Sequence, residues 1–437
     1  MALRVVWVTP FLPARGVSGT HAYLWALLER MSRRMAIRLV ALTDPDETAS
    51  PDDLPRGLAD VRLVRKLPWA GGDELLLRPR AVRWGFTHPA VREAVAAELV
   101  RADHDLVRWD YTELGDFVPL SRAPSVLAVH QLWFAAAGPE WRAGGGGFAR
   151  GAVALHRHLR DLDFELRAVR RARHVIALTR EDAARLRRFA PALRVSVVPA
   201  GIDLDHFRPL APAPPVVADV VFVGHYKHYA NVDAARFLVR EILPLLGRPV
   251  RVRLVGTAVS DEVRALRGDG VTIDSDVSDM RAALASAAVV VAPVRFGTGM
   301  RVKVLEALAM ARPVVATTLA AEGLEAVPGE HLLVADGAEA LATAVGRLLA
   351  DAGEAARLGR AGRAFAERRF GWDAVAAATE AVYDEVLQSG GAPAPPADAR
   401  VPTWARLAAR GGRPTAIAGG SLLLALRGLR WYLGSRS

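Results

Sequence analysis

A short segment near residue 300 places two cations where a helix is expected to begin. GTGMRVKVLEALAM, residues 297–310, has a glycine-bracketed turn and then an apolar helix-forming stretch, with Arg301 and Lys303 on its first turn. Cations are unfavourable beside the positive end of a helix dipole, so a bound anion would explain their position. The free N–H groups of a helix that starts near Gly299 or Met300 bind phosphate readily, and a guanidinium and an ammonium group add charge. The segment therefore predicts a phosphate-binding site.

Glu306 follows one turn later on the same expected helix. Its carboxylate could form an i,i+3 ion pair with Lys303, worth about 0.2–0.5 kcal/mol. Alternatively, it could accept hydrogen bonds from sugar hydroxyls, as acidic residues do for ribose in other nucleotide-binding folds. A phosphate site and a ribose acceptor together indicate a nucleotide diphosphate.

Several common nucleotide and metal motifs are missing. The segment contains neither a Walker A motif nor G-x-G-x-x-G, so it is not a P-loop or a dinucleotide fingerprint. The chain has no cysteine, which excludes disulfides, thiolate metal sites and cysteine nucleophiles. The acids of DSD, residues 274–276, are typical of a turn, and His156 and His158 are typical of a solvated helix face. None of these features indicates a bound metal or another cofactor.

Other residues are candidates because of where they fall along the chain. His130 ends the apolar run SVLAVH, and the active sites of α/β proteins gather at the ends of such strands. Lys227 lies between two histidines in GHYKHY, after another apolar run. Glu322, in the turn AAEGL, either contacts a ligand or caps the next element. The four glycines at 144–147 indicate a loop that could border an acceptor site.

Short apolar runs alternate with amphipathic segments over most of the chain. RVVWVT, AIRLVAL, DVVFVG and AVVVAPV are typical of strands, and THAYLWALLERM and NVDAARFLVREILPLL are typical of helices. This alternation, with nearly unbroken apolar strands, predicts an α/β fold with parallel sheets that are covered on both faces. The second helix is expected to bury one face, formed by Val232, Ala235, Phe237, Leu238, Ile242 and Leu245.

Proline-rich breaks divide the sequence. Four prolines between residues 201 and 218 mark a linker between two Rossmann-like domains, for which we predict residues 1–207 and 208–371. A ligand is expected in the cleft between these domains, at the carboxyl ends of the strands. The remaining segments are a helix, a linker rich in Pro, Gly and Ala, and a basic tail, predicted at 372–388, 389–400 and 401–437.

The net charge of +10 permits nucleic acid, anionic lipid or phosphorylated substrates as partners. A general preference for arginine in the organism's proteins is the alternative explanation of the charge. No acid follows Asp398, so much of the excess lies in the tail. Leucines at 422, 426, 429 and 433 share one helical face, which is typical of a helix that lies on an anionic membrane surface. A disordered tail or a helix docked on the protein itself are the alternatives.

The uncharged run from Pro414 to Leu426 is shorter than the roughly 20 apolar residues that span a bilayer. The first residues, MALRVVWVTPFLP, resemble a strand more than a signal peptide. We therefore expect a cytoplasmic protein. The basic, amphipathic tail could attach it to the inner face of the plasma membrane. Nucleic acid is not expected, because the basic residues outside the tail are not interleaved with aromatic ones.

Residues 1–388 resemble the family 4 glycosyltransferases of the GT-B fold, and in particular a bacterial sugar-transferase subgroup. The resemblance rests on segments in the expected order: VVWVTPFLPARGVSGTHAYLWALLERM, SVLAVHQLW, HVIALTREDAARL, VSVVPAGIDLDHFRP, VVFVGHYKHYANVDAARFLVREILPLL, VRFGTGMRVKVLEALAMARPVVATTLAAEGL and FGWDAVAAATEAVYDEVL. It implies two Rossmann-like domains, a final helix that crosses back to the first, a sugar nucleotide as donor, retention of anomeric configuration and no metal requirement.

The resemblance also implies roles for individual residues. Arg301 and Lys303 would bind the donor's diphosphate, and Glu306 would hold the ribose. Amides around Gly299 and Met300 would touch the phosphates. His130 would lie beside the transferred sugar. The resemblance also places Gly19 where the backbone approaches the phosphate or the acceptor, and it places Lys227 near the donor.

The sequence departs from the family pattern at three places. The family has two glutamates separated by seven residues; Glu306 matches the second, but Thr298 stands at the first. Many members carry an arginine after the first glycine of the second domain, where Lys227 fills only part of that role. Ser18 precedes Gly19 where a second glycine is usual. A hydroxyl or a backbone group, as at Thr298, must make the sugar contact of the missing glutamate, which leaves the donor sugar open.

These observations predict a glycosyltransferase that moves a hexose-type unit from a nucleotide diphosphate sugar to a glycan, lipid-linked or cell-surface polysaccharide acceptor. Two alternatives remain at this stage. A sugar-nucleotide epimerase or hydrolase could share the fold and the anion site. A non-catalytic binding subunit of a polysaccharide assembly complex is mildly favoured by the missing first glutamate.

Overall fold

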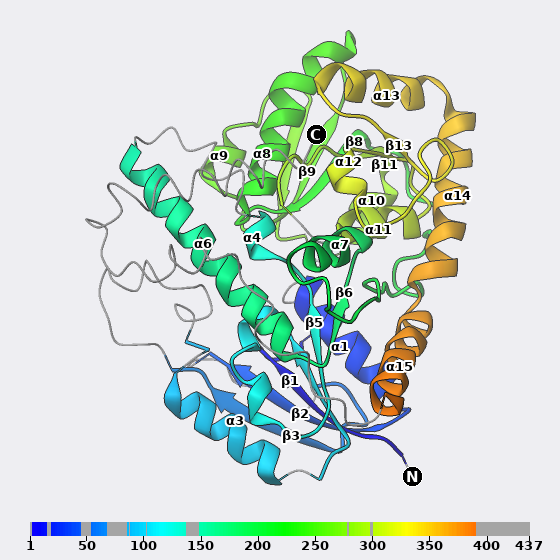
Figure 1. Ribbon diagram of the computed structural model, residues 1–437. Coiled ribbons are helices and arrows are strands. Elements are labelled where there is room, and N and C mark those ends of the chain that lie inside the picture. Colours follow the sequence, from blue (N-terminus) through cyan, green and yellow to red (C-terminus); the bar gives the residue numbers. More distant parts are fainter. Residues whose placement is uncertain are drawn as a thin grey trace. The chain divides into compact units, whose positions relative to one another are not determined.

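The computed structural model describes most of the chain up to residue 389. The chain forms two compact units, one made of residues 1–198 with those from 378 onward, and one of residues 199–377. Each is described separately below (Figure 1). The described residues are 2–14, 19–44, 54–67, 85–86, 88–101, 103–136, 148–277, 279–297 and 300–389.

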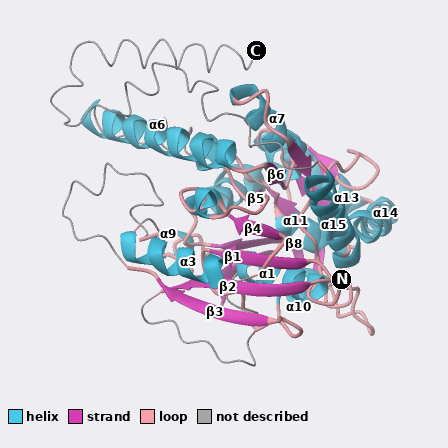
Figure 2. Cartoon of the chain, turned by 60° about the horizontal axis from the view of Figure 1, so that its bottom comes forward, coloured by secondary structure: helices cyan, strands magenta, loops and turns pink. Residues whose placement is uncertain are grey.

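The first unit is built on a parallel seven-stranded sheet with the order β3-β2-β1-β4-β5-β6-β7. Its neighbouring strands are visible side by side in Figure 2. The strands are short. The side chains of β1, β2, β4, β5 and β6 are almost all buried, as expected for a parallel sheet that helices cover, whereas most side chains of the edge strand β3 are not. They are β1 (Arg4–Thr9), β2 (Ala36–Thr43), β3 (Asp60–Arg65), β4 (Leu106–Asp110), β5 (Ser125–Val129), β6 (His174–Ala177) and β7 (Val195–Val197).

The helices of this unit pack against the sheet and complete its hydrophobic core. In α7, the Thr179 side chain accepts a hydrogen bond from the Asp182 N–H, which caps the first turn. The helices and helical turns are α1 (Gly19–Met31), α3 (Pro89–Arg101), η3 (Thr112–Leu114), η4 (Val118–Leu120), α4 (Trp133–Ala136), α6 (Phe148–Arg171), α7 (Arg180–Phe189) and the part of α15 (Trp372–Gln388) from Ala378 onward.

The second unit has a parallel six-stranded sheet with the order β10-β9-β8-β11-β12-β13. The strand order reverses between β8 and β11, as it does between β1 and β4 in the first unit. Ligands of such sheets bind at the carboxyl ends of the strands beside this reversal. The strands are β8 (Ala218–His225), β9 (Val252–Thr257), β10 (Val271–Ser275), β11 (Ala287–Ala292), β12 (Val314–Ala316) and β13 (Leu333–Val334).

The predicted helix over 231–246 is a continuous helical segment with three geometries. It runs through α8 (Tyr229–Phe237), the π-helical η5 (Leu238–Ile242) and the 3-10 turn η6 (Leu243–Leu246). Its expected apolar face is buried, but Leu245 is 50% exposed, because the helix changes its twist before this residue. The other helices are α9 (Asp261–Arg264), α10 (Met280–Ala285), α11 (Val302–Ala309), α12 (Thr318–Ala321), α13 (Ala338–Ala350) and α14 (Ala352–Phe370).

The α/β class and the two parallel sheets predicted from the sequence are confirmed. No helix within the described ranges is long and apolar enough to cross a membrane. The predicted linker at 389–400, apart from Ser389, and the basic tail at 401–437 lie outside the described residues, as does the glycine loop at 144–147.

Candidate functional site

The cationic segment lies at the carboxyl edge of the second unit's sheet, between β11 and α11. Helix α11 begins at Val302, with Arg301 at its N-cap position, so it starts later than the predicted Gly299 or Met300. Arg301 Nη2 donates to the Phe296 carbonyl at 3.3 Å. A Cβ atom at Gly297 would lie 3.0 Å from Arg301 Nη2, so glycine leaves room for the guanidinium. Thr298 and Gly299 lie outside the described residues, whereas Met300 is buried.

Lys303 points back over the sheet from the first turn of α11. Its ammonium group donates to Asn231 Oδ1 and lies 4.8 Å from the centre of the Phe222 ring. Burial lowers the pKa of Lys303 to about 7, and the charge of Arg301 lowers it further in the same direction. The two cations are thus close enough to repel each other. An anion placed between them would relieve this repulsion.

Glu306 lies one turn further along α11 and is half-buried. Burial raises its pKa to about 7, against the opposing charge of Lys303. A carboxyl group with this pKa is partly protonated near neutral pH and can both donate and accept hydrogen bonds. Such a group suits a hydroxyl-rich ligand.

The loop between β8 and α8 adjoins this segment, because β8 and β11 are neighbours in the sheet. Asn231, the partner of Lys303, also donates to the His225 carbonyl at 2.8 Å. Lys227 is exposed. Burial lowers the pKa of His228, and the charges of Lys303 and Lys227 contribute in the same direction. The structure therefore brings Lys227, Lys303 and Arg301 into one electropositive edge.

Glycines at the ends of β8 and β9 hold this edge compact. A Cβ atom at Gly256 would lie only 1.7 Å from the Gly224 carbonyl oxygen, so no larger residue fits there. His225 Nδ1 lies 2.6 Å from Thr257 Oγ1 across the same pair of strands. Glu322 follows α12 as its C-cap residue and is half-buried. It therefore ends one helix rather than capping the start of the next.

In the first unit, His130 directly follows β5 and is 9% exposed. Its Nε2 atom lies 2.7 Å from Oδ1 of Asp110, the last residue of the neighbouring strand β4. Asp110 also accepts hydrogen bonds from the Arg108 guanidinium at 3.1 and 3.2 Å and from the Trp7 indole. His130 is therefore held by a carboxylate at the edge where the two strands end.

The electrostatics fix the protonation of this pair. Burial alone would raise the pKa of Asp110, but the charge of Arg108 and the hydrogen bond from His130 hold it below its usual value. Burial lowers the pKa of His130, although Asp110 opposes the shift. A neutral His130 that donates from Nε2 to ionised Asp110 keeps Nδ1 as a hydrogen-bond acceptor.

Aromatic rings fix the plane of the His130 imidazole. Tyr111 stacks on it with ring centres 4.2 Å apart and planes at 11°, and Tyr23 meets it edge-on at 5.0 Å. Tyr111 has φ of 71°, a conformation that is uncommon outside glycine and is found at functional sites. Gly19 begins α1, after residues that lie outside the described ranges.

Sequence reasoning missed Asp110, Arg108, Trp7 and Tyr111. The signal was RWDY, a polar pair at spacing two inside an apolar run, which puts Arg108 and Asp110 on the same face of a strand. Trp7 of β1 pairs in register with Arg108 of β4, and the guanidinium lies 4.2 Å from the centre of the indole ring. The pairing of these strands could not be read from the sequence alone.

Two other sequence predictions are answered by the structure. Asp274, expected in a turn, instead lies in β10 and pairs with Arg253 at 2.6 Å. His158, expected on a solvated face, is 5% exposed instead, and burial lowers its pKa to about 4. This expectation was wrong because that turn of α6 faces the core. The side chain of His156 lies outside the described residues.

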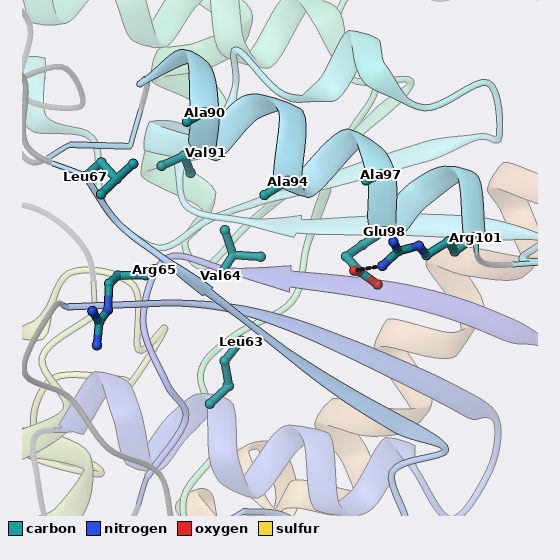
Figure 3. Close-up of a pocket in the computed structure, with 10 residues that line it drawn as sticks. All are labelled: Leu63, Val64, Arg65, Leu67, Ala90, Val91, Ala94, Ala97, Glu98 and Arg101. Atoms are coloured by element: carbon teal, nitrogen blue, oxygen red, sulfur yellow. Dashed lines mark hydrogen bonds and ion pairs between the residues drawn. The ribbon is translucent and has the colours of Figure 1, made fainter.

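A groove of about 450 Å³ lies elsewhere in the first unit, between the edge strand β3 and α3 (Figure 3). Apolar side chains such as Leu63, Val64 and Val91 line it, and Glu98 accepts a hydrogen bond from Arg101 at 2.9 Å at one end. It contains none of the residues predicted from the sequence to bind donor.

Comparison with known proteins follows the same division of the chain. Residues 17–206 match the family described as Glycosyltransferase Family 4, and residues 217–351 match the family described as Glycosyl transferases group 1. Both parts of the chain thus match glycosyltransferase families. The first match includes His130 and Asp110, and the second includes Lys227, Arg301, Lys303, Glu306 and Glu322.

This chain is similar to the D-inositol 3-phosphate glycosyltransferase of Xylanimonas cellulosilytica. The two are 34% identical over 243 residues, which is 49% of this chain and 57% of the relative. The aligned region thus spans little more than half of the relative's length.

Solved structures share the fold of this chain. Sucrose-phosphate synthase from Thermosynechococcus elongatus has a TM-score of 0.67 at 20% identity, over 89% of this chain and 100% of that one. HepE from Anabaena, in complex with UDP and glucose, has a TM-score of 0.62 at 15% identity, over 88% and 100%. At these identities the likeness shows the fold, which is that of the GT-B glycosyltransferases.

Proposed function

We propose that this protein is an enzyme that transfers a sugar from a nucleotide diphosphate sugar to an acceptor. The observation that carries the proposal is the cationic edge of the second unit, where Arg301 and Lys303 lie beside the strand reversal of a parallel sheet. Departure of a nucleoside diphosphate builds negative charge, and fixed cations stabilise that charge. The solved relatives that bind UDP and glucose support a sugar nucleotide as donor.

Each donor group has a partner of suitable chemistry. The diphosphate is bound by Arg301 and Lys303 and by the amides near Thr298, Gly299 and Met300. The ribose hydroxyls bind Glu306. Additional donor contacts are proposed for Lys227, Glu322 and Gly19. No metal is required in this scheme, because the two side-chain cations neutralise the leaving group; turnover is expected to continue in excess EDTA.

We propose front-face transfer with retention of configuration. The leaving phosphate takes the proton of the acceptor hydroxyl as the new glycosidic bond forms. His130, held by Asp110 and stacked on Tyr111, orients the donor sugar through its free Nδ1 acceptor. NMR of the product of a single turnover gives the anomeric configuration, and an inverted product would exclude this mechanism.

The acceptor is proposed to be a glycan, a lipid-linked glycan or a cell-surface polysaccharide precursor. The basic tail at 401–437 would hold the enzyme on an anionic inner membrane surface, with the catalytic units in the cytoplasm. Co-sedimentation of the full chain with vesicles tests this placement. We expect binding to phosphatidylglycerol-containing vesicles but not to phosphatidylcholine alone, and weaker binding after Arg427→Glu with Arg430→Glu. Equal binding to both vesicles would exclude an electrostatic anchor.

The donor site is tested by replacing both cations. Arg301→Ala with Lys303→Ala is expected to weaken the binding of UDP, or of whichever nucleoside diphosphate raises the melting temperature most, by at least tenfold in titration calorimetry. Charge-assisted hydrogen bonds of this kind contribute about 1.5–3 kcal/mol each. Arg236→Ala is the matched control, since it removes an exposed cation that pairs with Glu262 in the same unit. Unchanged affinity in the double variant would refute the proposed site.

A further inference from the structure

Besides Asp110, two other buried acids of the first unit contact the segment that follows His130. Glu165 of α6 is 2% exposed and Glu113 of η3 is 4% exposed. The hydroxyl of Thr112 joins them, at 2.9 Å from Glu165 Oε1 and 3.4 Å from Glu113 Oε2. The mechanism above uses none of these three residues.

Glu165 binds the segment that leaves β5 after His130. Its Oε1 atom accepts the Trp133 N–H at 3.1 Å, and its Oε2 atom accepts the Phe134 N–H at 2.9 Å. These residues begin the short helix α4, which packs on α6 (Figure 1). Both oxygens of one carboxyl group therefore hold the backbone three and four residues beyond His130.

Glu113 holds the same segment by its side chain. The Trp133 indole N–H donates to Glu113 Oε1 at 2.8 Å. Glu113 lies three residues after Asp110, and Trp133 lies three residues after His130. The segments that follow Asp110 and His130 are thus joined a second time, by the hydrogen bond from Trp133 to Glu113.

This arrangement is electrostatically costly, because two acids share a site with little water. Burial raises the pKa of Glu165 to about 8, and the charge of Glu113 contributes to the rise. Helix α4 has no titratable side chain, and on α6 itself Asp161 and His158 lie one and two turns away. Burying a carboxyl group only to fill space would bring this cost without any benefit. A carboxyl group that accepts hydrogen bonds from two buried amide N–H groups offsets it.

We propose that Glu165 is a positioning residue that fixes the segment from His130 to Phe134 by accepting the Trp133 and Phe134 amides. Its consequence for sugar transfer rests on the proposed function, but the clamp itself does not. When Glu165 ionises, both of its oxygens become full acceptors and the amides bind more strongly. The environment of Trp133 therefore follows the protonation of Glu165.

Fluorine NMR of the full chain labelled with 5-fluorotryptophan tests the clamp without any turnover. Trp133→Phe assigns the resonance. In the wild type we expect the Trp133 shift to titrate with a midpoint near pH 8, and in Glu165→Gln to stay constant between pH 6.5 and 9.5. Asp163→Asn is the matched control on the same helix, since Asp163 pairs with Arg167 near the surface and should leave the titration unchanged.

Thr112→Val provides a second, milder variant that keeps Glu165. It removes a hydrogen bond that favours the ionised carboxylate, so the midpoint is expected to move to higher pH. A wild-type Trp133 signal that is constant over this range, or one that titrates equally in Glu165→Gln, would overturn the proposal. An unmoved midpoint in Thr112→Val would equally contradict it.

Kinetics separates this proposal from the proposed function. On a donor that the wild type turns over, Glu165→Ala is expected to lower kcat at least tenfold with little change in UDP affinity, because UDP binds residues of the other unit. Normal kcat in Glu165→Ala would show that the clamp does not serve transfer. If the NMR titration appears but no sugar nucleotide is turned over, the clamp stands and the proposed function fails.

Discussion

At the scale of single residues, the most informative group is Lys303. A lysine normally has a pKa near 10.4, so a value of about 7 means that its ammonium form is not stabilised in the unliganded protein. A bound diphosphate would supply the missing negative charge and raise this pKa again. The lysine is therefore suited to becoming charged when the donor arrives, and its change of protonation can be measured.

We expect the enzyme to take up about one proton when UDP binds at pH 8, because Lys303 is mostly neutral there before binding and charged afterwards. Titration calorimetry in HEPES and in Tris detects this uptake, since the two buffers differ in ionisation enthalpy and neither is a phosphate. Lys303→Met should abolish the difference between buffers, and Arg236→Ala should not. Glu306→Gln checks that the proton is not taken up by the neighbouring carboxyl group. A buffer-independent enthalpy in the wild type would contradict this account of Lys303.

At the scale of structural elements, the edge formed by β4 and β5 determines how His130 is held. Asp110→Asn keeps the size of the side chain but removes the charge that fixes the His130 N–H. We expect a roughly tenfold to hundredfold lower kcat, since an incorrectly oriented histidine loses most of its contribution. UDP affinity should not change. Tyr383→Phe is the milder companion, because it removes only the 3.3 Å contact of Arg108 with the Tyr383 hydroxyl. Normal turnover in Asp110→Asn would exclude a role for this edge.

The same edge shows what could be predicted from the sequence. Apolar runs such as SVLAVH identified the strand before His130, because period and composition are local properties. Asp110 was missed, because its significance depends on β4 pairing with β5, which is a long-range property. The start of α11 was placed too early, because Arg301 adopts a non-helical N-cap conformation that residue types do not specify. The roles of Arg301, Lys303 and Glu306 remain predictions.

At the scale of the whole molecule, each unit contains an acid whose pKa is raised by burial. Glu165 has a pKa of about 8 in the first unit, and Glu306 has one of about 7 in the second. An unfolded chain would ionise both near pH 4.5. Between these values the folded state binds more protons than the unfolded state, so these two groups make stability fall as pH rises. Lys303 acts oppositely between pH 7 and 10.5, where the unfolded chain binds more protons.

The contribution of Glu165 can be isolated by comparing melting temperatures of the wild type and Glu165→Gln across pH. At pH 5 the Glu165 carboxyl group of the folded wild type is neutral. Glutamine therefore removes no buried charge at this pH and should bring no electrostatic gain in stability. From pH 5 to 8 the wild type pays a growing cost that glutamine avoids, on the order of a few kcal/mol at the upper limit. The melting temperature of the wild type should therefore fall relative to Glu165→Gln over this interval and then run parallel to it above pH 8.

Glu306→Gln should show the same trend, but the difference in melting temperature should level off near pH 7 because the pKa of Glu306 is lower. A difference that is constant with pH in both variants would mean that neither acid is buried in its neutral form, which would also remove the electrostatic basis of the Glu165 clamp.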